Sequence, residues 1–154
     1  MKRLIACGLI ALNLFIVSCS KDEIESRNDV VSFTITQEIL SLTNAHRNNM
    51  GLGNLERSVE ADQLALEHTR YMITQGNINH DNFMKRMEAL RGLVDAIAVG
   101  ENVAYGYATS ESVMEGWLNS SGHKANIEGD YTHIGIAAVK AEGGGFYYMQ
   151  LFFR

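Results

Sequence analysis

The sequence predicts an α/β protein built as a three-layer α-β-α sandwich, a sheet with helices on both faces. Apolar residues recur at helical spacing in several separate segments between about residues 36 and 118, and the chain ends in two strand-like segments joined by glycines. In the last segment, residues 146–153, both alternating sets of side chains are mostly apolar. A strand that is apolar on both sides indicates a sheet that is covered on both faces.

Residues 1–18 have the features of an export signal. Lys2 and Arg3 precede an apolar run from Leu4 to Val17, which is shorter than the roughly 20 residues that a membrane-spanning helix needs. The run ends at Ser18-Cys19 and resembles a bacterial lipobox, in which the cysteine becomes lipidated and forms the new N-terminus. We therefore expect a lipoprotein signal peptide over residues 1–18 and acyl chains on Cys19 that anchor the protein to a membrane. An ordinary signal peptide with an incidental cysteine is the alternative.

The residues after Cys19 predict a tether and a cellular localisation. Residues 19–35 are expected to form a lipidated, flexible tether because the chain is polar from Ser20 to about Val31. Ser20-Lys21-Asp22-Glu23 resembles the signal that sends some lipoproteins of Gram-negative bacteria to the outer face of the outer membrane. We expect an extracytoplasmic, lipid-anchored protein at the outer membrane, exposed on the cell surface; a plain solvated linker would explain these charges too.

Composition limits the partners and the chemistry. The chain has 154 residues and a formal net charge of −5, which becomes −7 when the two cations of residues 1–18 are removed. This balance and the lack of a basic patch argue against nucleic acid as a partner. The only cysteines are Cys7 and Cys19, so a domain over residues 36–154 has no disulfide and no thiolate. Its apolar core must hold it together.

The helices are predicted from their caps and their apolar spacing. A first helix is expected from about Thr36 to the glycines Gly51 and Gly53, and a second from Ser58, its N-cap, to Gln75, where Gly76 ends it. Residues 77–83 form a polar loop that carries His80. Shorter helices are expected at about 84–91 and from Thr109 or Ser110 through Leu118.

The rest of the chain is predicted as extended segments and turns. The stretch 96–105 is small and apolar, interrupted by Gly100-Glu101-Asn102. After Ser120-Ser121-Gly122-His123 we expect a short turn with Asn126 and Ile127. Residues 134–139 and 146–153 form an antiparallel hairpin at the C-terminus, because the glycines of 142–145 permit a tight turn.

Six motifs of the chain resemble a known family when they are taken together. In order they are Asn44-x-x-Arg47, His80, Gly100-Glu101-Asn102-Val103-Ala104, Trp117-x-x-Ser120-x-Gly122-His123-x-x-Asn126-Ile127, Ile134-Gly135-Ile136 and Tyr148-x-Gln150-x-Phe152. This arrangement is similar to the CAP superfamily (SCP/TAPS; cysteine-rich secretory and pathogenesis-related proteins), and to its bacterial branch, which lacks disulfides. The resemblance covers about residues 36–154 and implies the same α-β-α sandwich.

The resemblance also implies a cleft with two histidines and two glutamates. His80 matches the first histidine, Glu101 the glutamate of the Gly-Glu-Asn element and His123 the second histidine. The second glutamate lies three residues after the tryptophan, where this chain has Ser120. Two neutral imidazoles could hold Zn²⁺, and Glu101 could act as a general base toward a metal-bound water. With only His80 and His123 as ligands, such a zinc site should be weak.

Several of these residues also have purely structural explanations. His123 could cap a helix end, Glu101 could fix loop amides, and His80 could be a solvated loop residue. His68 lies on an apolar helix face, where a hydrogen-bonded core residue is expected more than a ligand. Trp117 is expected in the core.

Two functions compete. The first is a non-catalytic binding module whose cleft takes a small apolar ligand such as a lipid, a divalent metal or part of an extracellular protein; the family resemblance favours it. The second is a metal-assisted hydrolase or peptidase, with His80 and His123 on zinc and Glu101 as the base. Serine chemistry at Ser120 or Ser121 lacks a Gly-x-Ser-x-Gly elbow and is not favoured.

Overall fold

The structure, a computed structural model, describes the backbone of residues 22–154 and the side chains of residues 33–154. The expected signal peptide and Cys19 lie outside the described residues. The elements follow in the order α1 (Asp22–Asn49), β1 (Glu56–Arg57), α2 (Val59–Gln75), α3 (Phe83–Val94), β2 (Val99–Tyr105), α4 (Ser110–Leu118), α5 (Ser121–Ile127), β3 (His133–Lys140) and β4 (Phe146–Phe153). Among these helices, none is long and apolar enough to cross a membrane.

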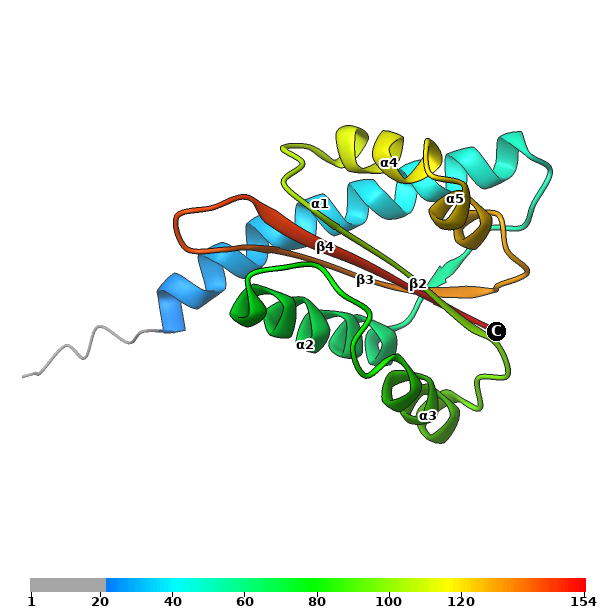
Figure 1. Cartoon of the computed structure of the whole chain (residues 1–154). Helices are drawn as coiled ribbons and strands as arrows, with labels where there is room; N and C mark the ends of the chain where they lie inside the picture. Colours follow the sequence, from blue (N-terminus) through cyan, green and yellow to red (C-terminus); the bar gives the residue numbers. More distant parts are fainter. Residues whose placement is uncertain (1–21) are drawn as a thin grey trace, which may run out of the picture.

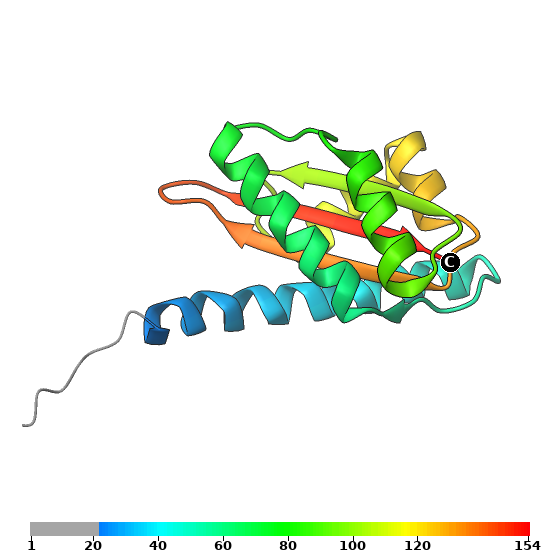
Figure 2. The same ribbon diagram turned by 90° about the horizontal axis from the view of Figure 1, so that it is seen from below.

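The sheet has four strands in the order β1-β3-β4-β2. β1 is parallel to β3, and the other pairings are antiparallel. The C-terminal hairpin sets Ile134 opposite Phe152 and Lys140 opposite Phe146. Helices α1, α4 and α5 cover one face of the sheet and α2 and α3 the other (Figures 1 and 2). The predicted three-layer sandwich with a C-terminal hairpin is therefore confirmed.

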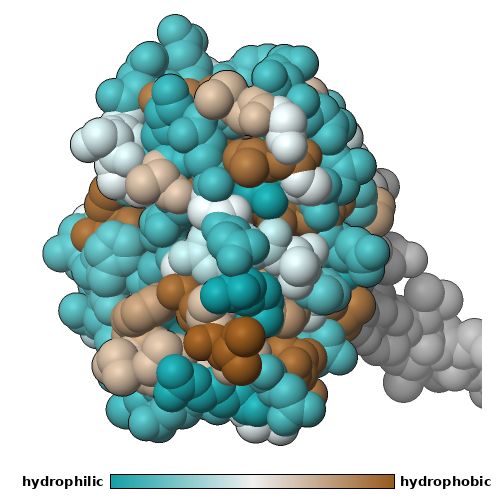
Figure 3. Space-filling model, turned by 90° about the vertical axis from the view of Figure 1, so that its right-hand side faces the viewer, coloured by the Kyte–Doolittle hydropathy of each residue, from teal (hydrophilic) through white to brown (hydrophobic). Residues whose placement is uncertain are grey.

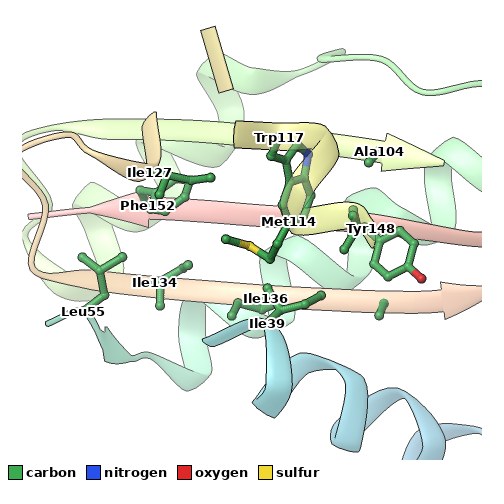
Figure 4. Packing of buried hydrophobic residues seen from close by; sticks show 12 residues of the cluster. Ile39, Leu55, Ala104, Met114, Trp117, Ile127, Ile134, Ile136, Tyr148 and Phe152 are labelled. Atoms are coloured by element: carbon green, nitrogen blue, oxygen red, sulfur yellow. The ribbon is translucent and has the colours of Figure 1, made fainter. Parts of the chain in front are cut away.

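Each face of the sheet packs against its own hydrophobic cluster. On the side of α1, α4 and α5, Trp117 and Met114 lie over the strands beside Tyr148 and Phe152 (Figure 4). On the other side, residues of α2 and Leu90 of α3 pack on alternate residues of β4, namely Tyr147, Met149, Leu151 and Phe153. Residues 146–153 are therefore apolar on both sides because each side of β4 packs in its own cluster, as the sequence indicated.

The ends of α2 show why its bounds could be predicted. Ser58 accepts a hydrogen bond from the N–H of Ala61, and Gly76 has a φ of 68°, the left-handed conformation that favours glycine. The Thr109 side chain caps α4 in the same way, through the N–H of Ser112.

Three elements differ from the prediction. α1 begins at Asp22 rather than near Thr36, because no glycine or proline interrupts residues 22–49 and acidic residues favour a helix N-terminus. The backbone of residues 22–35, expected as part of a flexible tether, is therefore helical. Residues 121–127 form the helix α5 rather than a turn, and the two-residue strand β1 was not predicted.

Candidate functional site

A cleft lies at the β2 edge of the sheet, where the two helix layers meet. It is a cavity of about 450 Å³. Its walls come from the loop before α3, from the start of β2 and from α5: His80, Phe83, Val99, Gly100, Glu101, Ser120, Gly122, His123 and Asn126. Figure 3 views the end of the molecule where the C-terminus lies, a mainly hydrophilic surface with separate apolar patches.

Glu101 is a buried carboxylate with both oxygens engaged. Its side chain is 4% exposed, and Arg86 of α3 donates to it from Nε (3.0 Å to Oε2) and from Nη2 (2.8 Å to each oxygen). His80 Nδ1 lies 2.6 Å from Oε1. Because the carboxylate can only accept, Nδ1 of His80 carries the proton, and Nε2 is the ring nitrogen left for a ligand.

His68 supports this ion pair from behind. Its Nδ1 lies 3.0 Å from Arg86 Nη1, and its Nε2 lies 2.8 Å from the carbonyl oxygen of Asn79. A guanidinium only donates, so Nδ1 of His68 accepts and the ring is neutral. Burial lowers the pKa of His68, which agrees with that state. His68 is therefore a hydrogen-bonded core residue, as the sequence suggested.

The opposite wall carries His123 and Ser120. Ser120 immediately precedes α5, and His123 lies in its first turns. Burial lowers the pKa of His123, and the nearby His80 lowers it further. Both effects favour the neutral imidazole, which has a lone pair for a ligand.

The Gly-Glu-Asn element holds the two walls together. A Cβ on Gly100 would meet the Tyr131 hydroxyl oxygen at 2.5 Å, so only glycine allows this close approach. Asn102 Nδ2 donates to the carbonyl oxygen of His123 (3.1 Å), and Asn126 Nδ2 donates to that of Glu101 (2.9 Å). These bonds fix α5 against β2 and so position His123 opposite His80.

The donor set fits zinc only in part. His80 has the arrangement typical of a ligating histidine, since one ring nitrogen donates to a carboxylate and the other is free. His123 adds a second neutral imidazole. Within the described residues, however, no group of three or more His, Cys, Asp or Glu side chains is placed to hold a metal ion. The Arg86 guanidinium adds positive charge behind Glu101. Residues 80 and 123 could contribute two ligands, and solvent would have to supply the others.

The structure brings together His80, Glu101, Ser120 and His123 around one cavity. Their roles toward a ligand stay predictions, and so does lipidation of Cys19. Sequence reasoning missed Arg86, which determines the state of Glu101. It lies four residues before the buried Leu90, on the inner face of α3, and a cation at such a position was the available signal.

Comparison with known proteins gives the family and the fold. The model of the CAP family, described as the cysteine-rich secretory protein family, matches residues 40–152. The uncharacterized membrane protein YlbC of Bacillus subtilis is 35% identical over 130 residues, which are 80% of this chain and 36% of that protein. The uncharacterized protein YkwD of the same organism is 29% identical over 109 residues, or 68% of this chain and 42% of YkwD. The chain thus spans less than half the length of these relatives.

Two solved structures share the architecture. An outer surface protein from Borrelia burgdorferi superposes with a TM-score of 0.71 at 22% identity, over 79% of this chain and 92% of that one. An extracellular protein of Bacillus anthracis that contains an SCP domain gives a TM-score of 0.68 at 26% identity, over 88% of this chain and 44% of that one.

Proposed function

This chain belongs to the CAP family of cysteine-rich secretory proteins, and from that membership and its cleft we propose that it is a non-catalytic binding module outside the cytoplasm. The cleft of His80, Glu101 and His123 takes the ligand, and lipid on Cys19 holds the module to a membrane, at the outer membrane and facing the cell surface. The names of relatives support the location: YlbC is called a membrane protein, and the Bacillus anthracis protein extracellular.

One observation carries the non-catalytic assignment. Glu101 accepts three hydrogen bonds from Arg86 and one from His80, so its lone pairs are occupied. A general base must have a lone pair within reach of the proton that it removes. Held in this way, Glu101 orients the His80 ring and does not act on a substrate. This argues against the metal-assisted hydrolase, which needs Glu101 as its base.

The cleft offers two kinds of contact to a ligand. Phe83 and Val99 supply apolar wall, and the imidazoles of His80 and His123 supply acceptor nitrogens. Small-molecule sites are typically cavities of a few hundred Å³ whose walls are mainly apolar and carry a few polar groups. A small apolar molecule with one polar group fits this lining, and a divalent metal held by the two imidazoles or a side chain of an extracellular partner would use the same nitrogens.

Analysis of the native ligand tests the proposal directly. The whole chain is purified from its own membrane, and its bound lipids and metals are identified by mass spectrometry, in wild type and in His80→Ala. We expect a bound species that His80→Ala loses, while the partly exposed His133→Ala, a matched control, keeps it. Turnover of a peptide or ester library by the wild type that Glu101→Gln abolishes would replace the binding module with the hydrolase.

The metal form of the proposal has its own test. Calorimetry with zinc should show weak binding that weakens further as the pH falls and the imidazoles take protons. Ser120→Glu should tighten zinc, because it adds an anionic neighbour at the position of the family's second glutamate. If zinc binds equally well to His80→Ala, the two histidines are not its site.

A further inference from the structure

A larger cavity lies at the opposite edge of the sheet from the cleft, between α1 and α2. Its volume is about 850 Å³. The strand β3, from Ile136 to Lys140, forms one side, and Leu66 and Arg70 of α2 form another; Phe33 of α1 and Phe146 also line it. We call this cavity the β3 groove. None of the residues of the cleft lines it.

The pairing of β3 at this edge stops early. β1 pairs only with His133 and Ile134. One step further, the Ser58 N–H donates to the carbonyl oxygen of Ile134 (3.0 Å), and the Ile136 N–H donates to Asp62 Oδ1 (2.7 Å). The Asp62 carboxylate thus takes the place of a paired strand and ends the ladder.

Beyond Ile136 the edge of β3 has no partner among the described residues. In an antiparallel pair, alternate residues direct their N–H and C=O groups toward the neighbouring strand and away from it. Since Ile134 and Ile136 bond away from β4, Ala138 and Lys140 also direct their groups away from it, into the β3 groove. No described residue forms a hydrogen bond with the N–H or C=O groups of Ala138 and Lys140. Lys140 is exposed and Ala138 is 1% exposed, so a strand that adds to this edge meets the Lys140 groups first and reaches those of Ala138 only as it enters the groove.

At the other edge of the sheet, side chains cap the backbone groups of β2 that no strand pairs with. Along β2 the carbonyl oxygen of Glu101 accepts from Asn126 Nδ2 (2.9 Å), and that of Val103 accepts from Trp117 Nε1 (3.3 Å). Those side chains come from helices α4 and α5 and cover the edge. Unpaired edge strands are templates for a further strand, and β3 past Ile136 is left as one.

Cationic side chains lie near the unpaired edge of β3. Arg70 and Lys140 are exposed and form no ion pair with any described residue. Arg57 is paired with Asp62 (2.7 Å), but its Nη1 is buried without a hydrogen-bond partner in the described part of the chain. Of the acidic residues that line the groove, Asp62 is engaged in this pair and with Ile136, which leaves Glu142. On a chain of net charge −5, this groove is a locally cationic site.

We propose that the β3 groove binds an extended, acidic segment of a partner protein, which adds to β3 as a further strand. Its backbone would supply the missing partners of Ala138 and Lys140, and its carboxylates would meet Arg70 and Lys140. Recognition of this kind takes affinity from main-chain hydrogen bonds and specificity from alternate side chains. A fatty acid would satisfy the cations but would cover the free N–H and C=O groups with hydrocarbon, which costs free energy.

A synthetic strand tests the proposal. The probe is an end-blocked nine-residue peptide that alternates valine with glutamate, labelled with fluorescein and titrated with the whole chain in detergent. Two further versions carry N-methyl groups on alternate residues, one version for each edge of the peptide. We expect the parent peptide to bind, one N-methylated version to bind about as well, and the other to lose at least about tenfold in affinity, because only one edge pairs with β3.

Variants of the chain locate the binding. Arg70→Glu with Lys140→Glu should weaken the peptide about tenfold or more, whereas Arg91→Glu, an exposed cation on α3, should not. Hydrogen exchange by NMR should show the amide of the exposed Lys140 protected only when peptide is present. The proposal fails if the peptide does not bind at millimolar concentration, if both N-methylated versions bind like the parent, or if a lysine-for-glutamate peptide binds as well. Palmitate that displaces the peptide and leaves the Lys140 amide unprotected would assign the groove to lipid.

Discussion

Arg86 determines the state of the carboxylate in the cleft. Its side chain is 7% exposed and that of Glu101 is 4% exposed, so the ion pair is shielded from water. The same guanidinium also donates to the carbonyl oxygen of Asp81 (2.6 Å), which fixes the loop that carries His80. One side chain thus positions both a carboxylate and a histidine of the cleft.

Replacement of Arg86 should therefore be costly. Arg86→Met leaves Glu101 buried without its charge partner, and we expect a loss of about 3–5 kcal/mol in the free energy of unfolding. Arg91→Met, an exposed position on the same helix, should change it by less than about 0.5 kcal/mol. Urea denaturation measures both. Equal effects of the two substitutions would mean that the Arg86–Glu101 pair contributes no net stability.

His68 predicts a pH dependence of stability. Burial lowers its pKa in the folded state below the ordinary value of 6.5, so the unfolded chain binds more protons once the pH drops below about 6.5. The stability that neutral His68 contributes to the folded state is fully present above about pH 6.5. It is lost as the pH falls from about 6.5 toward the folded-state pKa of His68. His123 acts in the same direction.

Urea midpoints at pH 7.5, 6.5 and 5.5 check this dependence. The midpoint of the wild type should decline between pH 6.5 and 5.5, and His68→Gln should decline less because it removes one of the two groups. If the urea midpoint of His68→Gln falls with pH as steeply as that of the wild type, His68 is not a buried neutral histidine in the folded state.

At the scale of elements, Trp117 connects α4 to the sheet. It is 1% exposed, meets Tyr148 edge-on (ring centroids 6.5 Å apart, 86° between planes), and caps the Val103 carbonyl. Trp117→Ala removes this contact area and leaves a cavity, so we expect a loss of about 3–5 kcal/mol in the free energy of unfolding. Denaturant melts measure it. An unchanged midpoint would show that the indole does not hold α4 on the sheet.

The elements that could be predicted are those with local signals. α2 and α4 have side-chain caps and apolar stripes, and the hairpin has glycines between two apolar runs. β1 has two charged residues and exists only because β3 lies beside it, so nothing local indicates it. α5 is seven residues long and is held by Asn102 and Asn126 across the cleft. Such contacts between distant parts of the chain cannot be read from spacing.

The same distinction applies to the site. His80, Glu101, Ser120 and His123 could be named because six motifs occurred in the order of a family, and the structure gathers them around one cavity. Spacing alone could not have identified them as one site, because they come from the loop before α3, from the edge strand β2 and from the start of α5. The hydrogen bonds that engage Glu101 were equally inaccessible, since Arg86 belongs to no motif.

For the whole molecule, the two edges of the sheet have different surroundings. The β2 edge is capped by side chains and forms the cleft, whereas the β3 edge has no strand partner beyond Ile136 among the described residues and is lined by cations. The two proposed binding sites, the cleft and the β3 groove, therefore lie apart on one molecule. A module held at a membrane surface could use both at once, because they lie at opposite edges of the sheet.

Attachment to the membrane is the last property of the whole molecule to test. We expect lipid on Cys19 to be the anchor, because the segment that ends at Ser18-Cys19 resembles a lipobox. Cys19→Ala should move the protein from the membrane fraction to the soluble fraction, with no acyl mass on the N-terminus. Its urea midpoint should stay that of the wild type, because the described members of both hydrophobic clusters belong to residues 35–153. Fractionation and mass spectrometry of the N-terminus measure this, with Ser20→Ala as the neighbouring control. If Cys19→Ala stays in the membrane fraction, another part of the chain or a partner holds it there.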